Sequence, residues 1–396
     1  MTAPAAGARL PAFLWLVALG NLVVGTGGFV IGGMIEPLSR SLGLSVAAAG
    51  QLMTVYAIAN AIGAPMLIAL TSRYEARRVL PLALVALGLT NALSALATSF
   101  GELAAARVLM ALAAGVFTAT GSAMAVALVA PAQRGRAISV VFSGISLAYI
   151  VGVPLGTWAA YRHGWQVAFW VVAATALALT PVLLKLRPGA GVVASQPANF
   201  RRVLRNPRLV LALSITVTYA ASVFTIFSYI GAFLRGYADL SPAQVSTTLM
   251  GFGVAALAGN FVGGWGTDRL GATRMLYAVC VAFAAIFAAL WALPGASGPL
   301  VAITLFWGTV GFAFMSAQTT RLVAMSPQDA PALMSLNSAT ISGGTALGAA
   351  IGGAVIAVWG YRGLPVTCAA LVAVIALLVR VTEPTPVAAG LRPQAR

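Results

Sequence analysis

The composition of the chain excludes most classes of soluble protein. Of its 396 residues, 60% are hydrophobic and only 8% are charged, whereas soluble domains carry about 25% charged residues. The formal net charge of +16 is typical of nucleic-acid binding, but the basic residues are spread between long apolar runs, so no nucleic-acid partner is expected.

Twelve apolar runs follow one another along the chain. Each is long enough to cross a hydrocarbon core of about 30 Å as a helix, and too long for a barrel strand. The first continues past the apolar region of a signal peptide and is interpreted as a retained helix. The runs cover residues 12–35, 46–70, 79–98, 102–129, 137–161, 165–184, 209–234, 243–266, 275–294, 299–325, 331–360 and 364–381. We therefore predict an all-α membrane protein with twelve transmembrane helices.

The segments between these runs differ in charge on the two sides of the membrane. Most Arg and Lys residues lie on the side of the N-terminus, and only Arg40, Arg162, Arg235 and Arg362 lie on the other. By the positive-inside rule, both termini are expected in the cytoplasm. The predicted location is a bacterial-type inner (plasma) membrane.

Neither a metal site nor a cofactor is expected. Cys280 and Cys368 fall within apolar runs, where small buried side chains are the simpler interpretation. His163 is the single histidine, and a zinc site needs companion ligands. No nucleophile, base and orienting group can be assembled near the runs, so an enzyme is not expected.

The chain contains a duplicated unit. Landmarks recur at one offset of about half the chain, which predicts two bundles of six helices. The matching positions are Leu44-Ser45 with Leu240-Ser241, Ser72-Arg73 with Asp268-Arg269, and Gly152 and Gly156 with Gly348 and Gly352. The predicted divisions are an N-terminal bundle (1–184), a cytoplasmic linker rich in Pro, Gly and Arg (185–208), a C-terminal bundle (209–381) and a cytoplasmic tail (382–396).

Several motifs resemble the major facilitator superfamily. GGWGTDRLGATR (263–274) resembles the signature of its loop between helices 8 and 9. GISLAYIVGVPLG (144–156) resembles the helix 5 motif of its twelve-span drug and metabolite:proton antiporters. Within it, the sequence GVPLG is similar to that of the arabinose-efflux-type permeases. LAAARVLMALAAG (103–115) is similar to the helix 4 motif and supplies Arg107. The resemblance implies two pseudo-twofold six-helix bundles that work by alternating access.

Small residues recur every four positions in the fifth and eleventh runs. Such stripes let helices approach closely, and we predict that they form a surface on which the two halves rock; static helix packing is the alternative. The stripes are Gly144, Ala148, Gly152 and Gly156 in the fifth run and Gly344, Gly348 and Gly352 in the eleventh, and the predicted rocking surface consists of these glycines with Pro154.

The resemblance implies that helices 1, 4, 7 and 10 line a central cavity. In the seventh run, hydroxyl side chains step by three or four residues and indicate a polar face; hydrogen bonding to carbonyls of their own helix is the alternative. Arg107 is either a substrate anchor or a structural pin that binds nearby carbonyls and Glu102. The predicted cavity residues are Asn21, Arg107, Thr118, Thr218, Ser222, Thr225, Tyr229, Trp307, Phe314 and Gln318.

No acidic residue lies at the centre of a run. The arabinose-efflux-type permeases carry a Glu in helix 1 and a His in helix 4, where this chain has Gly28 and Ala114. Proton coupling is therefore expected to be weak or located near the outer mouth, at Glu36 or Glu102. The alternatives are that Glu102 meets a helix dipole and that Glu36 ends a span.

The two loop motifs predict an asymmetric cytoplasmic gate. Asp268 should face the start of helix 5, near Arg134 and Arg136, whereas Ser72 in the other half cannot make that contact. There Arg73, Arg77 or Arg78 is expected to pair with Asp329 at the start of helix 11. The predicted gate residues are Arg73, Arg77, Arg136, Asp268, Arg269 and Asp329.

We therefore predict a secondary active transporter that exports a small neutral, amphiphilic or anionic solute by proton-coupled alternating access. One alternative is a facilitator or exchanger that needs no proton, and another is a sensor or scaffold that transports nothing. The expected partners are a small-molecule substrate, the lipid bilayer and protons as the candidate coupling ion, and the expected state is a monomer.

Overall fold

The structure is a computed structural model that describes residues 10–71, 73–130, 133–185 and 200–383. Over these residues it contains twelve helices long and apolar enough to cross a membrane, so the predicted fold class is confirmed. The spans are Ala12–Leu42 (α1), Val46–Thr71 (α2 to α3), Ala76–Leu96 (α4), Phe100–Ala127 (α5), Arg134–His163 (α6 to α7), Trp165–Lys185 (α8), Pro207–Phe227 (α10), Pro242–Leu270 (α12), Ala272–Ala292 (α13), Ser297–Met325 (α14), Ala332–Trp359 (within α15, Ala330–Trp359) and Gly363–Val381 (α16).

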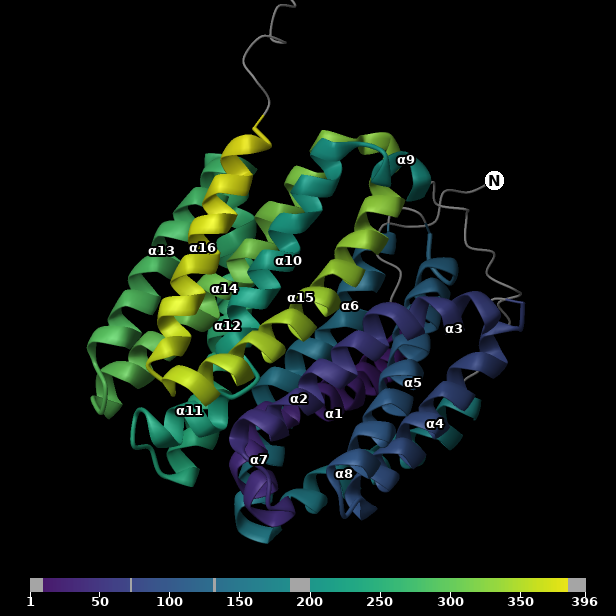
Figure 1. Cartoon of the computed structure of the whole chain (residues 1–396). Helices are drawn as coiled ribbons and strands as arrows, with labels where there is room; N and C mark the ends of the chain where they lie inside the picture. The colour runs from purple at the N-terminus through teal and green to yellow at the C-terminus, as the bar shows by residue number, and fades with distance from the viewer. Residues whose placement is uncertain (1–9, 72, 131–132, 186–199, 384–396) are drawn as a thin grey trace, which may run out of the picture.

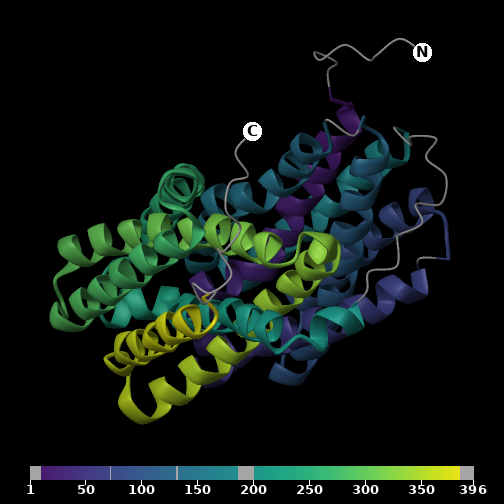
Figure 2. The ribbon, with the colours of Figure 1, turned by 90° about the horizontal axis from the view of Figure 1, so that it is seen from above.

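The helices form two bundles of six. Helices α1 to α8, in purple and blue, pack together in the N-terminal half, and α10 to α16, in teal to yellow, pack together in the C-terminal half (Figure 1). The two groups lie side by side when the molecule is turned (Figure 2). We call the face where α1 begins and α16 ends the terminal face, and the opposite face the distal face.

Equivalent helix starts support the duplication. Ser45 caps the N-terminus of α2 (Val46–Ile58) by accepting from the backbone N–H of Ala48. Ser241 caps α12 in the same way, as part of a capping box with Gln244. Such caps satisfy backbone donors that the first helical turn leaves free, so the repeated Leu-Ser pair marks the same structural position in both halves.

Two helices contain a π-helical segment at a shared sequence motif. Segment η1 (Ala59–Gly63) precedes Pro65 in the sequence IGAP, and η3 (Ala148–Gly152) precedes Pro154 in VGVP. Proline has no N–H to donate to the helix ladder. In each case the residue before the proline donates its N–H to the carbonyl five residues earlier. The two segments divide these spans into α2 and α3 (Ala64–Thr71), and into α6 (Arg134–Leu147) and α7 (Val153–His163).

Two spans differ most from the boundaries that the apolar runs predict. The first continues through Pro37 to Leu42, where Gly43 ends it in a left-handed conformation with a φ of 63°. The seventh run is not one helix, because the chain leaves helical geometry at Tyr229 and resumes as the short helix α11 (Ile230–Gly236). Hydropathy could not show this break, since both sides of it are equally apolar.

Contacts between the halves concentrate toward the distal face. Helix α15 packs along α2 and η1, α12 packs against η3 and α7, and α11 packs against α1. In contrast, α3, the part of the second span nearest the terminal face, packs against α5 of its own half. The structure is therefore a state in which the two halves meet at the distal face.

Candidate functional site

An ion-pair network joins the halves at the distal face. Glu36, near the end of α1, accepts a hydrogen bond from Nε of Arg235 in α11 at 2.7 Å and another from the hydroxyl of Tyr161 in α7 at 3.0 Å. Its second oxygen accepts from Arg40 of its own helix at 2.5 Å. Because Arg235 belongs to the C-terminal half, the pair between Glu36 and Arg235 can form only while the halves meet here.

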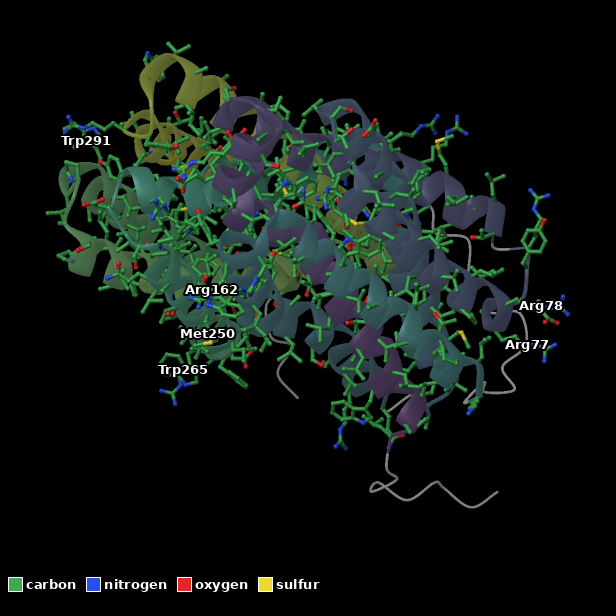
Figure 3. The ribbon with its side chains drawn as sticks, turned by 90° about the horizontal axis from the view of Figure 1, so that it is seen from below. Arg77, Arg78, Arg162, Met250, Trp265 and Trp291 are labelled. Carbon is green, nitrogen blue, oxygen red and sulfur yellow. The ribbon has the colours of Figure 1, made fainter. Side chains whose placement is uncertain are left out.

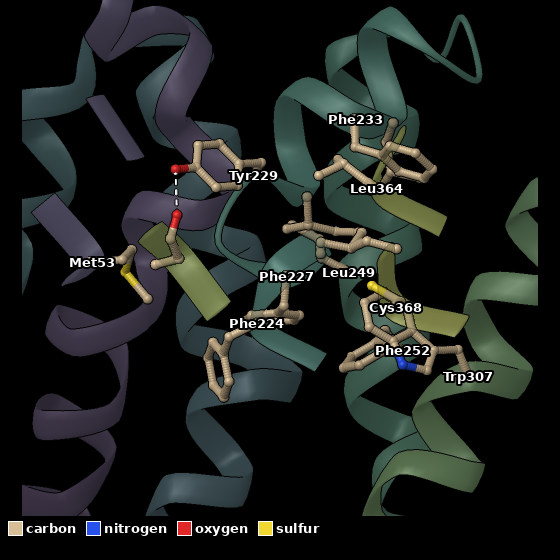
Figure 4. Packing of buried hydrophobic residues seen from close by; sticks show 14 of the residues in the cluster. Met53, Phe224, Phe227, Tyr229, Phe233, Leu249, Phe252, Trp307, Leu364 and Cys368 are labelled. Carbon is tan, nitrogen blue, oxygen red and sulfur yellow. Dashed lines mark hydrogen bonds between the residues drawn. The ribbon is translucent and has the colours of Figure 1, made fainter. Parts of the chain in front are cut away.

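Tyr229 fills the space between α2 and α15 beside this network. Its side chain is fully buried. Its hydroxyl donates to the carbonyl of Ala349 at 2.8 Å (Figure 4) and accepts from the amide of Gln51 at 3.2 Å. Glycines surround the ring, and a Cβ added at Gly50 or Gly353 would collide with it. Because the seventh span breaks here, the Tyr229 side chain lies between the two halves and forms hydrogen bonds to both.

The backbones of the two halves also touch at this face. A Cβ added at Gly231 of α11 would collide with the carbonyl of Gly33 in α1, and one added at Gly32 would lie 2.6 Å from the carbonyl of Phe227. Only glycine allows so close an approach. These contacts, Tyr229 and the Glu36 network together form what we call the distal gate.

Five aromatic rings from four helices meet just inside the distal gate. Phe29 of α1 stacks on Tyr149 of η3, with ring centroids 5.1 Å apart, and lies 5.9 Å from Phe224 of α10. Tyr149 also meets Phe227 and Phe312 edge-on, at 5.6 and 5.7 Å. Phe29, Tyr149 and Phe312 are only half-buried. The seam between the halves is therefore apolar and aromatic at mid-span.

Arg107 is buried inside the N-terminal half. Its two terminal nitrogens donate to the carbonyls of Gly27 and Gly28 in α1, at 2.6 and 2.8 Å, and its guanidinium lies 4.3 Å from the centre of the Tyr56 ring. Glu102, the partner that the sequence suggested, instead accepts from the backbone N–H and hydroxyl of Thr98. The geometry supports a pin between α5 and α1, and the bond predicted with Glu102 is not formed.

Asn21 and Thr118 tie three helices of the N-terminal half together. The amide of Asn21 donates to the carbonyl of Val141 at 2.9 Å, and the hydroxyl of Thr118 donates to Asn21 at 2.8 Å. Asn21 is fully buried, whereas Thr118 keeps part of its surface uncovered. The predicted role of these two residues in a substrate cavity stays a prediction.

The hydroxyl stripe of the seventh span serves mainly the packing of its own half. Thr218 and Thr225 donate to carbonyls of α10 at 2.9 and 2.7 Å. Ser222 donates to the carbonyl of Cys368 in α16 at 3.2 Å. These bonds match the alternative in which helix hydroxyls satisfy nearby carbonyls, and the predicted substrate contacts stay predictions.

The predicted cavity residues of α14 are likewise buried. Trp307 packs among the aromatic rings of the C-terminal half, and Phe314 stacks on Tyr219 with centroids 3.8 Å apart. Gln318 donates to the carbonyl of Ala212 at 2.7 Å and so joins α14 to α10. A role for these side chains in binding substrate stays a prediction.

The glycine stripes pack against helices of their own half in this structure. In the N-terminal half, a Cβ at Gly144 would collide with the carbonyl of Ala18, and one at Gly152 with Thr26, while Gly156 packs on Val30. All three partners lie on α1 of the same half. Pro154 follows η3 and interrupts the helix ladder.

The stripe of the C-terminal half behaves in the same way. Gly344, Gly348 and Gly352 pack on carbonyls of α10. In this state the stripes make close contacts within each half, which matches the static-packing alternative, and their role as a rocking surface stays a prediction. A small-residue stripe indicates a close helix contact but does not identify the second helix.

Among the described residues, the predicted gate residues at the terminal face form no ion pairs across the halves. Asp268 is exposed and forms no ion pair with another described residue, and Arg269 lies over the ring of Trp265. Arg77 pairs with Glu75 of its own loop at 2.6 Å and, like Arg78, points away from the bundles (Figure 3).

Arg73 donates to the carbonyl of Leu70, and Arg136 is exposed. Ser72 lies outside the described residues. The predicted gate concerns the state in which the terminal face is closed, so its pairing with Asp268 stays a prediction.

Asp329 pairs with the segment that connects the halves rather than with Arg73, Arg77 or Arg78. Nε of Arg202, in the short helix α9 (Phe200–Leu204), donates to its carboxylate at 2.7 Å, and Ser326 donates at 2.8 Å. Val203 is buried against the same end of the C-terminal half. The described part of the connecting segment is therefore attached to that half.

The contact between Arg202 and Asp329 is expected to be lost at low pH. The Arg202 hydrogen bond and, to a lesser extent, that from Ser326 hold the pKa of Asp329 below its ordinary value. A lowered pKa means that the contact is fully present above the ordinary pKa of about 4 and is lost only as pH falls through the lowered value. The protection factor for amide hydrogen exchange in α9 should be unchanged from pH 7 to pH 5, and Asp329→Asn should lower it at pH 7. Equal exchange in wild type and variant would contradict this attachment.

Some polar contacts between the halves were not predicted. Asn60, within η1, accepts a hydrogen bond from Ser342 of α15 at 3.0 Å and donates to the carbonyl of Ala111 at 3.2 Å. Gln51 bonds Tyr229, as described above. Their one signal in the sequence is a pair of amides within an apolar run, which is costly in lipid and so indicates a protein-facing side.

The comparisons with known proteins agree with this architecture. The family model described as Major Facilitator Superfamily matches residues 17–331 and 239–396. The chain is 30% identical to the inner membrane transport protein YdhP of Escherichia coli over 92% of this chain and 94% of the relative. It is 32% identical to a chloramphenicol resistance protein of Streptomyces lividans, over 79% and 81% of the two chains.

Solved structures share the fold at low sequence identity. A bacterial homologue of the human lysosomal transporter Spinster, in an inward-facing and unoccupied conformation, superposes with a TM-score of 0.78 at 15% identity, over 94% of this chain and 96% of the other. The nucleoside transporter NupG gives a TM-score of 0.76 at 16% identity, over 93% and 98%. These likenesses show the fold.

The chain therefore belongs to the major facilitator superfamily, as its motifs indicated. Its relatives and its fold are those of membrane transporters and not of enzymes. It is a multi-pass membrane protein with relatives in the bacterial inner membrane.

Proposed function

We propose that the protein exports a small neutral, amphiphilic or anionic solute by alternating access, with proton coupling through the distal mouth. The observation that carries the proposal is the contact between the halves at the distal face, made by the ion pair of Glu36 with Arg235 and by the buried side chain of Tyr229. At the terminal face, Asp268 is exposed and forms no ion pair with a described residue. An alternating-access transporter needs a state that is closed at one face and a second state that is closed at the other face. The positive-inside rule supports a cytoplasmic terminal face.

Two observations support the substrate class. The five rings at the seam offer apolar and aromatic surface, and no acidic side chain stands among them. A cationic solute would lack a counter-charge there. One relative is a chloramphenicol resistance protein, which fits export of an uncharged amphiphile.

Glu36 is the better of the two candidate proton sites. Glu102 is held at the start of α5 by Thr98, a contact within one half that need not change during transport. Glu36 contacts Arg235 of the other half, and its remaining charged or titratable neighbours are Arg40, Tyr161 and Tyr361. Protonation of Glu36 would remove the charge that holds Arg235, so acid on the distal side should favour distal opening.

Flux measurements in proteoliposomes test this proposal. We expect transport of chloramphenicol or a similar neutral amphiphile to be faster with an acidic distal side, and this dependence to disappear in Glu36→Gln. The matched control Glu102→Gln should keep it. Glu36→Gln also removes the partly exposed ion pair with Arg235, which contributes about 1 kcal/mol, so this variant should raise the distal-open population about fivefold.

The alternative functions predict other results. Equal flux with and without a pH gradient in the wild type would favour a facilitator or exchanger, which the presence of Gly28 and Ala114 in place of the family's Glu and His supports. No flux of any solute in a broad panel would favour a sensor or scaffold.

A further inference from the structure

A pocket opens at the distal face beside the ion-pair network. Its volume is about 410 Å³, within the range of sites for small organic ligands. Both halves line it: Glu36, Ser39, Arg40 and Val46 come from the N-terminal half, and Ala232, Arg235, Gly236 and Tyr361 from the C-terminal half. The complete pocket therefore exists only while the distal gate is closed.

The pocket carries an excess of positive charge. Two guanidinium groups, those of Arg40 and Arg235, share the single carboxylate of Glu36, which leaves a net charge of +1 among the lining residues. The remaining lining residues are uncharged. A small ligand with one negative charge would balance the pocket.

Both arginines keep N–H donors that their hydrogen bonds to other described residues do not use. A guanidinium has five N–H donors. Arg235 gives one from Nε to Glu36 and one from Nη1 to the carbonyl of Leu240, at 3.2 Å. Arg40 gives one from Nη2 to Glu36, and its side chain is 73% exposed. The geometry leaves N–H groups on each half that can bind the same oxyanion, and such charge-assisted bonds are strong.

We propose that this pocket binds a small oxyanion, a carboxylate or phosphate group, that clamps the distal gate closed. A ligand held by Arg40 and Arg235 at once is bound to both halves. It therefore favours the state that contains the complete pocket, by its difference in affinity between the two states. The oxyanion comes either from solution or from the phosphate of a lipid headgroup. The clamp regulates the proposed transport, but its binding can be measured without transport.

The test uses the full chain in nanodiscs of phosphatidylcholine, with spin labels at Ser41 and Ser297, one exposed position on each half. The buried cysteines Cys280 and Cys368 are replaced by alanine to keep labelling specific. Inorganic phosphate replaces chloride at constant ionic strength, and the distance distribution between the labels is measured. We expect a saturable loss of the long-distance population, by about tenfold at a phosphate concentration of ten times Kd.

Two variants distinguish the pocket from general charge effects. Arg40→Gln removes one guanidinium but leaves the pair between Glu36 and Arg235, so the phosphate effect should disappear. Arg162→Gln removes an exposed arginine that does not line the pocket, and the effect should remain. No saturable effect in the wild type, or an undiminished effect in Arg40→Gln, would overturn the proposal.

A second series of nanodiscs contains phosphatidylglycerol and no free phosphate. The same shift there, dependent on Arg40, would support the site with a lipid headgroup as its occupant. A shift produced only by free phosphate would support a soluble anion. Failure of transport in proteoliposomes would count against the proposed function and would leave these binding results unaffected.

Discussion

Gly231→Val is expected to shift the protein strongly away from the distal-closed state. A Cβ at this position collides with the backbone of Gly33 in the opposite half, and backbone cannot move aside as a flexible side chain can. Overpacking of this kind costs about 1 to 3 kcal/mol. Since the collision exists only in the distal-closed state, we expect the distal-open population to rise at least about fivefold, measured by the distance between labels at Ser41 and Ser297.

Gly298→Val is the matched control. Gly298 lies at the distal end of α14, and no atom lies within 4 Å of a Cβ built on it. We expect that variant to keep the wild-type distribution. An unchanged distance distribution in Gly231→Val, together with the thermal unfolding midpoint of the wild type, would show that the backbone contact does not define a conformational state.

Arg107→Met is expected to cause a large loss of stability in the N-terminal half. Methionine keeps much of the side-chain volume but lacks the N–H groups that donate to the carbonyls of Gly27 and Gly28. Hydrogen bonds from charged groups contribute about 1.5 to 3 kcal/mol, so we expect unfolding to become easier by about 2 to 3 kcal/mol. Chemical denaturation of the purified protein measures this difference.

Two further variants separate a pin from a substrate anchor. Arg107→Lys keeps the charge, but a single ammonium cannot reproduce the fork between two carbonyls, so its stability should be intermediate. Arg162→Met, at an exposed arginine, should leave stability unchanged. We expect the folded fraction of Arg107→Met to bind substrate with the wild-type Kd. A lost affinity at unchanged stability would show that Arg107 is an anchor instead.

The fold could be predicted because lipid imposes simple rules on sequence. Spans of about 20 apolar residues and a repeated Leu-Ser cap define the twelve helices and their duplication. One prediction fails for a reason that hydropathy cannot show. The hydroxyls of the seventh run were placed on one continuous helix, but the chain breaks at Tyr229 and turns that side chain toward α2 and α15.

The distal gate could not be predicted from the sequence. Glu36 and Arg235 are 199 positions apart, and either one alone reads as an ordinary charge at the end of a span. Likewise, the stripe from Gly144 to Gly156 shows that some helix approaches closely, but only the structure shows that it is α1. Local patterns determine what a surface can contact, and the arrangement of the helices determines which contact forms.

The most direct test of alternating access is to measure both faces of one protein preparation. Distances are recorded between Ser41 and Ser297 at the distal face, and between Arg134 and Arg274 at the terminal face, using labels on cysteine variants of these exposed residues. We predict that acidifying the distal side lengthens the first distance and shortens the second in the same proportion of molecules. Distances that both lengthen, or that do not change together, would contradict the account.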